Sequence, residues 1–238
     1  MNETVKNVLR RARWRFRAAA GRDVYVRPDV HREVVAVGGD LASGYGAWHI
    51  VAGSLTPESV VYSVGIGDDV SFDIELIRRF GVTIHAFDPT PESQTWLEAQ
   101  ALPERFHARP VALAATDGPL ALYANASEGV LSHSALTGTH TRGEAVEVDG
   151  RRLATLMREN GHDHVDLLKM DVEGAEYEVL TDLLRSGADV RQLLVEFHHR
   201  FPEIGPGATR EAIAALRGAG YRVFHVSATG REYGFIRT

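Results

Sequence analysis

The stretch VVYSVGIGDDVSFDIELIRRFGVTIHAFDP at residues 60–89 contains a strand, a helix and a second strand in succession. Residues 60–64 form a short apolar run that a Gly-x-Gly turn interrupts, and residues 72–80 carry apolar side chains at helical spacing. Residues 82–87 form the second apolar run. A strand–helix–strand unit of this kind predicts two parallel strands joined by a crossover helix.

The same alternation continues to the end of the chain. It predicts further helices at residues 92–101, 175–184 and 209–217, and further strands at residues 106–113, 165–170, 192–197, 221–226 and 232–236. Residues 120–147 are poor in helix signals and predict a short hairpin followed by a long loop. We therefore expect an α/β fold with a mostly parallel sheet, helices on both faces and an antiparallel edge strand from the closing pair.

The composition is that of one globular domain. The 238 residues are 44% hydrophobic and 24% charged, and they include no cysteine, which excludes disulfides, thiolate metal sites and a cysteine nucleophile. No apolar run approaches the roughly 20 residues that span a bilayer, and the first residues lack the apolar core of a secretory signal. We expect a soluble cytoplasmic protein without a membrane span.

Charge divides the chain into two parts. Residues 1–32 hold nine Lys and Arg against three Asp and Glu, whereas the remainder holds 17 against 29. We expect a basic helical extension over residues 1–40 and one folded domain over residues 41–238. The acidic domain argues against a nucleic-acid partner, because that affinity depends on neutralising phosphate charge. The extension is expected to pack on its own domain, to lie on an anionic surface or to join two copies in a homodimer.

The turn after the first strand predicts a cofactor site, since ligands of open α/β sheets bind beyond the carboxyl ends of the strands. Gly65 and Gly67 let the backbone approach a ligand closely, and Asp88 after the next strand can accept both hydroxyls of a ribose. Val70 breaks the G-x-G-x-x-G pattern of dinucleotide sites. Asp68 would oppose a pyrophosphate but attract the sulfonium and ammonium of S-adenosylmethionine (SAM), so SAM is favoured over NAD.

Four motifs resemble the FkbM-type family of SAM-dependent methyltransferases. They are YGAW at residues 45–48, VYSVGIGDDVSFD at 61–73, AFDPTP at 86–91 and KMDVEGAE at 169–176. The resemblance implies a Rossmann-like class I methyltransferase fold with a seven-stranded sheet over residues 41–238, SAM as the methyl donor and transfer to oxygen. Ser63 stands where many SAM enzymes have an acidic residue, and Asp68 is expected to replace that residue.

The strand ends and the resemblance together predict the residues that contact SAM. They are Tyr45, Trp48, Ser63, Gly65, Gly67, Asp68, Phe87, Asp88, Pro89, Ala112, Ser134 and Asp171. Residues 125–142 are rich in hydroxyl groups and histidine, and we expect them to close over the site as a lid.

Acidic residues and histidines after two neighbouring strands predict the catalytic group. An alcohol acceptor needs a base for its proton, and Asp171 and His198 are the candidates. The residues expected to contact the substrate are His133, Glu173, Glu196 and His199. The alternative roles are a core histidine bonded to a neighbouring carboxylate, and acidic residues that cap a helix. Such a group could also ligate Mg²⁺, but D-x-E spacing is common, and we expect no metal.

The sequence therefore predicts an enzyme that transfers a methyl group from SAM to a hydroxyl oxygen of a small molecule, such as a sugar or a natural-product intermediate. Two alternatives stay open, namely an NAD-linked oxidoreductase and a protein that binds SAM without catalysis. Binding of NAD in the absence of SAM binding would favour the first, and SAM binding without turnover would favour the second.

Overall fold

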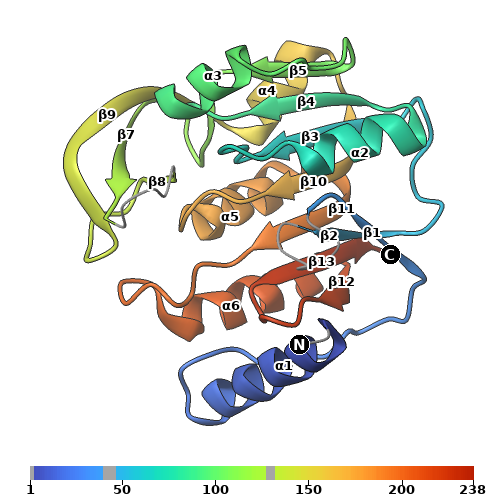
Figure 1. Ribbon diagram of the computed structural model, residues 1–238, viewed down its shortest axis with the longest axis vertical. Helices are drawn as coiled ribbons and strands as arrows, with labels where there is room; N and C mark the ends of the chain where they lie inside the picture. Colours follow the sequence, from blue (N-terminus) through green and yellow to red (C-terminus); the bar gives the residue numbers. More distant parts are fainter. Residues whose placement is uncertain (1–2, 40–46, 127–131) are drawn as a thin grey trace.

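A seven-stranded sheet forms the centre of the molecule (Figure 1). The computed structural model describes residues 3–39, 47–126 and 132–238. In order across the sheet, the strands are β12 (Tyr221–Val226), β13 (Glu232–Arg237), β11 (Asp189–Glu196), β10 (His164–Met170), β3 (Val60–Val64), β4 (Thr83–Phe87) and β5 (Phe106–Arg109). Neighbouring strands from β11 to β5 run parallel. The expected α/β fold with a mostly parallel sheet is confirmed.

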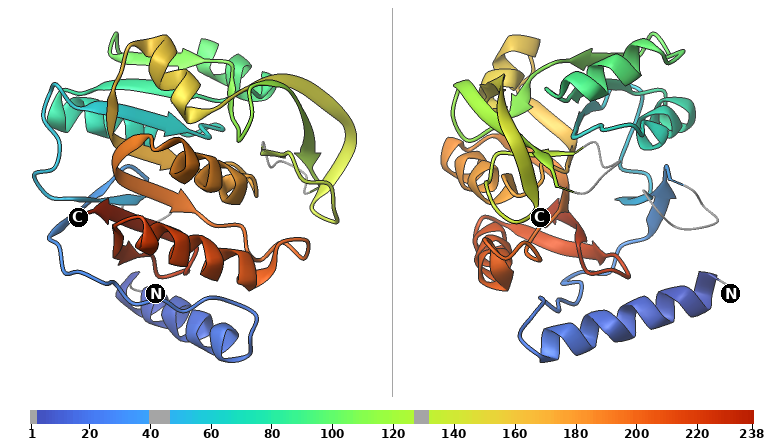
Figure 2. Two further views of the ribbon diagram at one scale, coloured as in Figure 1. Left: turned by 180° about the vertical axis from the view of Figure 1, so that it is seen from behind. Right: turned by 60° about the vertical axis from the view of Figure 1, so that its left-hand side comes forward.

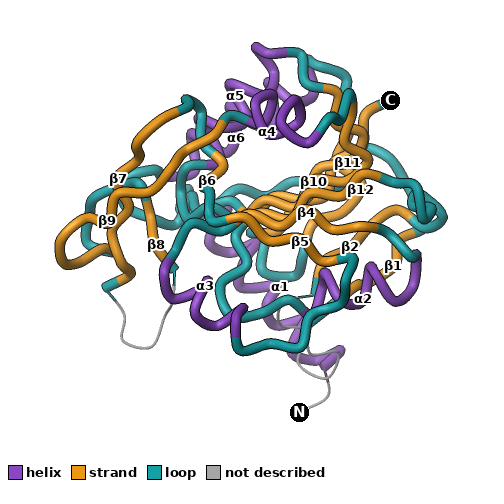
Figure 3. The backbone as a smooth tube through the Cα atoms, turned by 90° about the horizontal axis from the view of Figure 1, so that it is seen from above, coloured by secondary structure: helices purple, strands orange, loops and turns teal. Residues whose placement is uncertain are grey.

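Helices cover both faces of this sheet (Figure 3). One face carries α2 (Ser71–Phe80) and α3 (Pro91–Glu98), and the other carries α4 (Leu153–Asn160), α5 (Glu176–Ser186) and α6 (Gly205–Gly218). Alternate residues of a strand point to opposite faces, so Tyr62 joins the core beneath α4 to α6 and Val61 joins the core beneath α2 and α3. Both faces of the central strands are therefore buried, which explains their continuous apolar runs.

The closing hairpin differs from the expectation in one detail. Strand β13 is antiparallel to both β11 and β12 and lies between them, so the strand at the edge is β12. The crossover through α6 leaves one position between β11 and β12, and the returning β13 fills it.

A second sheet replaces the short hairpin and long loop that we expected after β5. Its order is β6 (Ala112–Leu113), β9 (Thr141–Arg151), β7 (Gly118–Asn125) and β8 (His133–Ser134). The long β7–β9 pair projects beyond the carboxyl ends of the main sheet (Figure 2). Strand β9 is exposed along most of its length, so it lacks the apolar alternation that marks a strand in a sequence. Pro110, which has no N–H to donate, separates β5 from β6.

The N-terminal helix α1 (Glu3–Ala19) lies at the β12–β13 end of the main sheet, below these strands in Figure 1. Its Trp14 is buried and donates a hydrogen bond of 2.8 Å from Nε1 to the carbonyl oxygen of Val24. After the helix, the buried carboxylate of Asp23 bonds His199 at 2.7 Å and Arg200 at 2.9 Å. The apolar side chains that α1 leaves exposed are Val5, Val8, Leu9 and Phe16. Within the part of the chain that the structure describes, no helix is long and apolar enough to cross a membrane.

Candidate active site

A cavity of about 980 Å³ opens at the carboxyl ends of β3, β4, β10 and β11. Strand β4 pairs with β3 on one side and β10 pairs with it on the other, so the strand order reverses at β3. Open α/β sheets bind ligands at such a reversal. The predicted SAM contacts that line it are Trp48, Gly65, Gly67, Asp68, Phe87, Asp88, Pro89, Ala112 and Asp171. The predicted catalytic and substrate residues that line it are Asp171, His198, His133, Glu173 and Glu196.

Three predicted residues lie outside the cavity lining, and Tyr45 lies outside the described residues. Ser63 is buried in β3. Ser134 supports the site from behind, because its Oγ donates a hydrogen bond of 2.6 Å to the carbonyl oxygen of Glu173. His199 is not brought to the substrate side. It lies in the turn after β11, and its Nε2 bonds the carboxylate of Asp23, which follows α1, at 2.7 Å.

The turn after β3 depends on Gly65. Its φ is +76°, and a Cβ atom there would lie 1.8 Å from the carbonyl oxygen of Asp171. The N–H of Gly65 donates to the carbonyl oxygen of Phe87 at 3.1 Å, which ties the turn to the end of β4. Gly67 also has a positive φ, +58°, but no atom lies within 4 Å of where its Cβ would be. Gly65 therefore lets the turns after β3 and β10 touch.

The carboxylate of Asp88 holds the glycine turn in shape. Its Oδ2 accepts the N–H groups of Ile66 and Gly67, both at 2.9 Å. Its Oδ1 accepts the N–H of Thr90 at 2.9 Å and the Thr90 hydroxyl at 2.7 Å. A ribose hydroxyl that bonds Oδ1 would therefore compete with the Thr90 hydroxyl. The sequence pointed to Asp88 as a ribose contact but not to this second role in the loop.

A buried pair of opposite charges, Asp73 and Lys169, lines the same end of the cavity and was not predicted from the sequence. Burial raises the pKa of Asp73 to about 6, and the nearby charge of Lys169 works against that rise. One carboxylate oxygen of Asp73 has no hydrogen-bond partner within the described residues. The signal was present in the sequence, since Asp73 falls at i−3 and i−7 from Leu76 and Phe80, inside the apolar stripe of α2.

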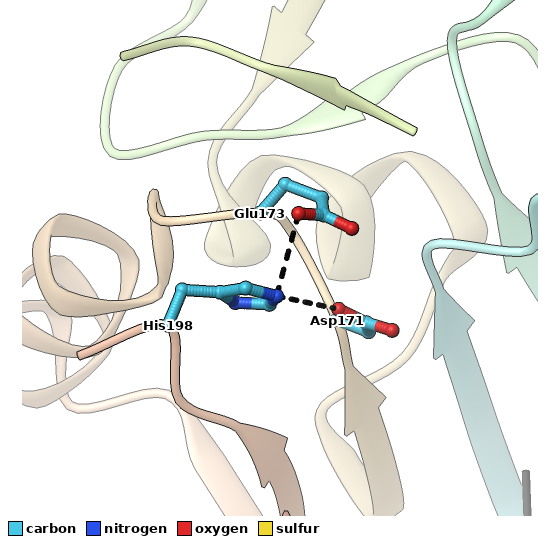
Figure 4. A group of neighbouring side chains, drawn as sticks. All are labelled: Asp171, Glu173 and His198. Carbon is cyan, nitrogen blue, oxygen red and sulfur yellow. Dashed lines mark ion pairs between the residues drawn. The ribbon is translucent and has the colours of Figure 1, made fainter. Parts of the chain in front are cut away.

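Asp171, Glu173 and His198 converge at the other end of the cavity (Figure 4). The Nε2 atom of His198 lies 3.7 Å from Oδ1 of Asp171 and 3.4 Å from Oε2 of Glu173. Asp171 and Glu173 follow β10, and His198 follows β11, so the parallel pairing of these strands brings the three together. Glu173 has a φ of +49°, a left-handed conformation that is uncommon for a residue with a Cβ.

Glu176 holds His198 from the side away from the cavity. Its buried carboxylate accepts the N–H of His198 at 2.6 Å and the N–H of Gly174 at 2.8 Å, and its Oε1 lies 3.4 Å from Nδ1 of His198. Burial lowers the pKa of His198, but the carboxylates of Glu176, Asp171 and Glu173 outweigh it and raise the pKa to about 10. Without another cation, the imidazole is therefore positively charged near neutral pH.

The contribution of α1 to the wall of the cavity was also not predicted from the sequence. Asn7, Arg10 and Arg11 of α1 line the cavity, so the basic extension contributes to the site. On the same side, the guanidinium of Arg231 lies 2.9 Å from Oε1 of Glu196. Burial raises the pKa of Glu196, and the charge of Asp171 adds to that rise. The sequence predicted a basic helical extension over residues 1–40 but contained no information on which element it would meet.

Comparisons with known proteins support a methyltransferase. The chain is 29% identical over 201 residues to the 31-O-demethyl-FK506 methyltransferase FkbM of Streptomyces tacrolimicus, an alignment that covers 71% of this chain and 75% of that protein. It is 25% identical over 182 residues to "Probable methyltransferase-like protein 24" of Rattus norvegicus, covering 71% of this chain and 43% of that protein. Its fold resembles the fibrillarin pre-rRNA processing protein of Methanococcus jannaschii, with a TM-score of 0.50, 11% identity and coverage of 90% and 86%.

The alignment thus spans less than half the length of the rat relative. The family model of the methyltransferase FkbM domain matches residues 59–223, which include β3, β4, β10 and β11 and the turns that follow these four strands. The resemblance read from the four motifs is therefore confirmed. This chain belongs to the methyltransferase FkbM domain family of SAM-dependent methyltransferases.

Proposed function

We propose that this protein transfers a methyl group from SAM to a hydroxyl oxygen of a small molecule. The observation that carries the proposal is a single cavity that joins the glycine turn after β3 to the acidic and histidine side chains after β10 and β11. Small-molecule sites have volumes of roughly 300–1,000 Å³, so a cavity of about 980 Å³ leaves room for a cofactor and a small acceptor. The name of the Streptomyces relative, a 31-O-demethyl-FK506 methyltransferase, supports an oxygen acceptor.

The residues around the glycine turn fit SAM, whose methionine end carries an ammonium and a carboxylate. Asp73 offers a buried negative charge with one unpartnered oxygen among the described residues, and Lys169 offers a positive charge near it. We infer that these two side chains hold the ammonium and the carboxylate, while Asp88 holds the ribose hydroxyls. Asp73 would then take the role that Ser63 leaves open, in place of Asp68, whose side chain is exposed.

The acceptor would lie against Asp171 at the other end of the cavity. SAM supplies a methyl group that is already electrophilic, so the protein has to hold the acceptor oxygen in line, an effect worth up to about 7–11 kcal/mol. As the oxygen gains the methyl group, its proton passes to Asp171, which lines the cavity and is 30% exposed. His198 acts as a positioning residue behind Asp171, and Glu196 and His133 contact the acceptor.

The remaining expectations about partners and location stay predictions. The exposed apolar side chains of α1 support a homodimer through this helix, and the acidic domain supports a small acceptor over a nucleic acid. The cytoplasmic location rests on the sequence alone. The comparisons do not favour an NAD-linked oxidoreductase.

Calorimetric titration with SAM, with NAD as a control ligand, tests the methyl donor. We expect micromolar affinity for SAM and at least tenfold weaker binding by Asp88→Asn, a loss of about 1.4 kcal/mol. Glu98→Gln, an exposed position on α3, is the control and should leave the affinity unchanged. Binding of NAD by a folded protein that does not bind SAM would refute the proposal.

A screen of hydroxylated small molecules, read by release of S-adenosylhomocysteine and by the mass of the product, tests transfer to oxygen. Asp171→Asn should lower kcat much more than it changes the affinity for SAM. A protein that binds SAM but releases no S-adenosylhomocysteine with any acceptor would favour SAM binding without catalysis.

A further inference from the structure

The group formed by Asp171, Glu173 and His198 has the geometry of a cation site. Each side chain offers one ligand atom, and these three atoms lie within 4.8 Å of one another (Figure 4). Two different loops supply them, the one after β10 and the one after β11, and both loops face the cavity. A metal ion needs several donors from separate segments that converge on one point, and this group meets that requirement.

The bonding state of these atoms fits a bound cation. Oδ1 of Asp171 is buried and has no hydrogen-bond partner within the described residues. The side chain of His198 is only 6% exposed, and its Nε2 faces the two carboxylates at 3.4 and 3.7 Å, longer than the usual range of about 2.7–3.2 Å for an N–H···O bond. Buried polar atoms are almost always bonded, and an ion between them is one way to satisfy them.

The residue behind His198 supports the same conclusion. Histidines that bind metals usually direct their other ring nitrogen at a carboxylate or carbonyl, which sets the tautomer and the orientation of the ring. Here Nδ1 of His198 faces Oε1 of Glu176 at 3.4 Å, with no hydrogen bond to it among the described residues, and the backbone N–H groups of Gly174 and His198 hold that carboxylate beside the ring. A proton on Nδ1 would face this carboxylate, which leaves the lone pair of Nε2 directed at the cavity.

We propose that Asp171, Glu173 and His198 bind one divalent cation, and that Mn²⁺ is the ion that this donor set fits. Carboxylate oxygens suit Mg²⁺, Ca²⁺ and Mn²⁺, but an imidazole nitrogen favours a transition ion over Mg²⁺, which prefers an all-oxygen shell. Three protein donors leave further positions open towards the cavity, where water or two oxygens of an acceptor can bind. The second oxygen of Asp171 points away from His198 (Figure 4).

Titration with Mn²⁺, followed by the electron paramagnetic resonance signal of the free ion, tests the site directly. We expect one bound ion per chain and at least tenfold weaker binding by Glu173→Gln. Glu178→Gln, an exposed position on α5 five residues further along the chain, is the control and should bind Mn²⁺ as the wild type does. Circular dichroism of each variant establishes that it is folded, and Asp171→Asn provides a second loss of charge at the site.

The imidazole ligand has its own spectroscopic test. Coupling of bound Mn²⁺ to a nitrogen nucleus should be present in the wild type and absent from His198→Gln. A folded wild-type protein without a site at millimolar Mn²⁺, equal binding by Glu173→Gln and Glu178→Gln, or tighter binding of Mg²⁺ than of Mn²⁺ would overturn the proposal. SAM titration of the same samples is a separate readout, so failure of the cation site and failure of the methyl-donor site are distinguishable.

Discussion

Replacing Gly65 with Ala tests whether the turn after β3 is built against the turn after β10. The added methyl carbon would lie 1.8 Å from the carbonyl oxygen of Asp171 and 2.9 Å from its carbonyl carbon, so backbone has to move. The left-handed φ of +76° costs a residue with a Cβ about 1–2 kcal/mol. Forcing a packed contact apart costs about 1–3 kcal/mol more. We therefore expect Gly65→Ala to lower the free energy of unfolding by about 2–5 kcal/mol.

Gly67→Ala is the control for the backbone part of this cost. Its φ of +58° is also left-handed, but no atom lies within 4 Å of the added carbon, so we expect a loss of only about 1–2 kcal/mol. Urea unfolding followed by circular dichroism measures both variants, and calorimetry with SAM then reports whether the cavity survives. Equal destabilisation by the two substitutions would show that the two turns do not touch.

Three further predictions follow from buried or exposed side chains. Because burial raises the pKa of Asp73 to about 6, SAM affinity should fall about fivefold between pH 6 and pH 5 as this carboxylate is protonated, and calorimetry should find a flat profile for Asp73→Asn. Burial raises the pKa of Asp23, but the bond from His199 and other bonds outweigh burial and hold this pKa below its usual value. The stabilisation by the Asp23 carboxylate is therefore present above the unfolded pKa and is lost in acid. Asp23→Asn should cost roughly 3–5 kcal/mol at pH 7 in urea unfolding, and less as the pH falls below 4. Phe16→Ser should change the free energy of unfolding by less than about 0.5 kcal/mol yet shift a wild-type dimer to monomer in sedimentation, and a monomeric wild type would contradict the homodimer.

The main sheet could be predicted because its strands are marked by local patterns. The apolar run at residues 60–64 is β3 as expected, and the helix expected over residues 72–80 is α2, which Gly81 ends with a φ of +69°. Two of the elements that were not predicted, β9 and α4, lack such marks. Strand β9 is exposed along most of its length, and the eight-residue α4 follows it directly. A polar strand is stabilised by its hydrogen bonds to a partner strand, and the periodicity of one segment does not show that partner.

The candidate site was likewise only partly predictable from the sequence. Glycine after a strand, an acidic residue after the next strand and the histidine after β11 are local features, and they were enough to predict a SAM site at the carboxyl edge of a parallel sheet. Only the tertiary structure decided which charged side chains lie close together. Parallel pairing of β10 and β11 brings His198 to Asp171, the turn after β11 brings His199 to the carboxylate that follows α1, and the packing of α2 buries Asp73 near Lys169. These contacts join residues far apart in the chain, and long-range packing chooses such pairs rather than the sequence around either residue.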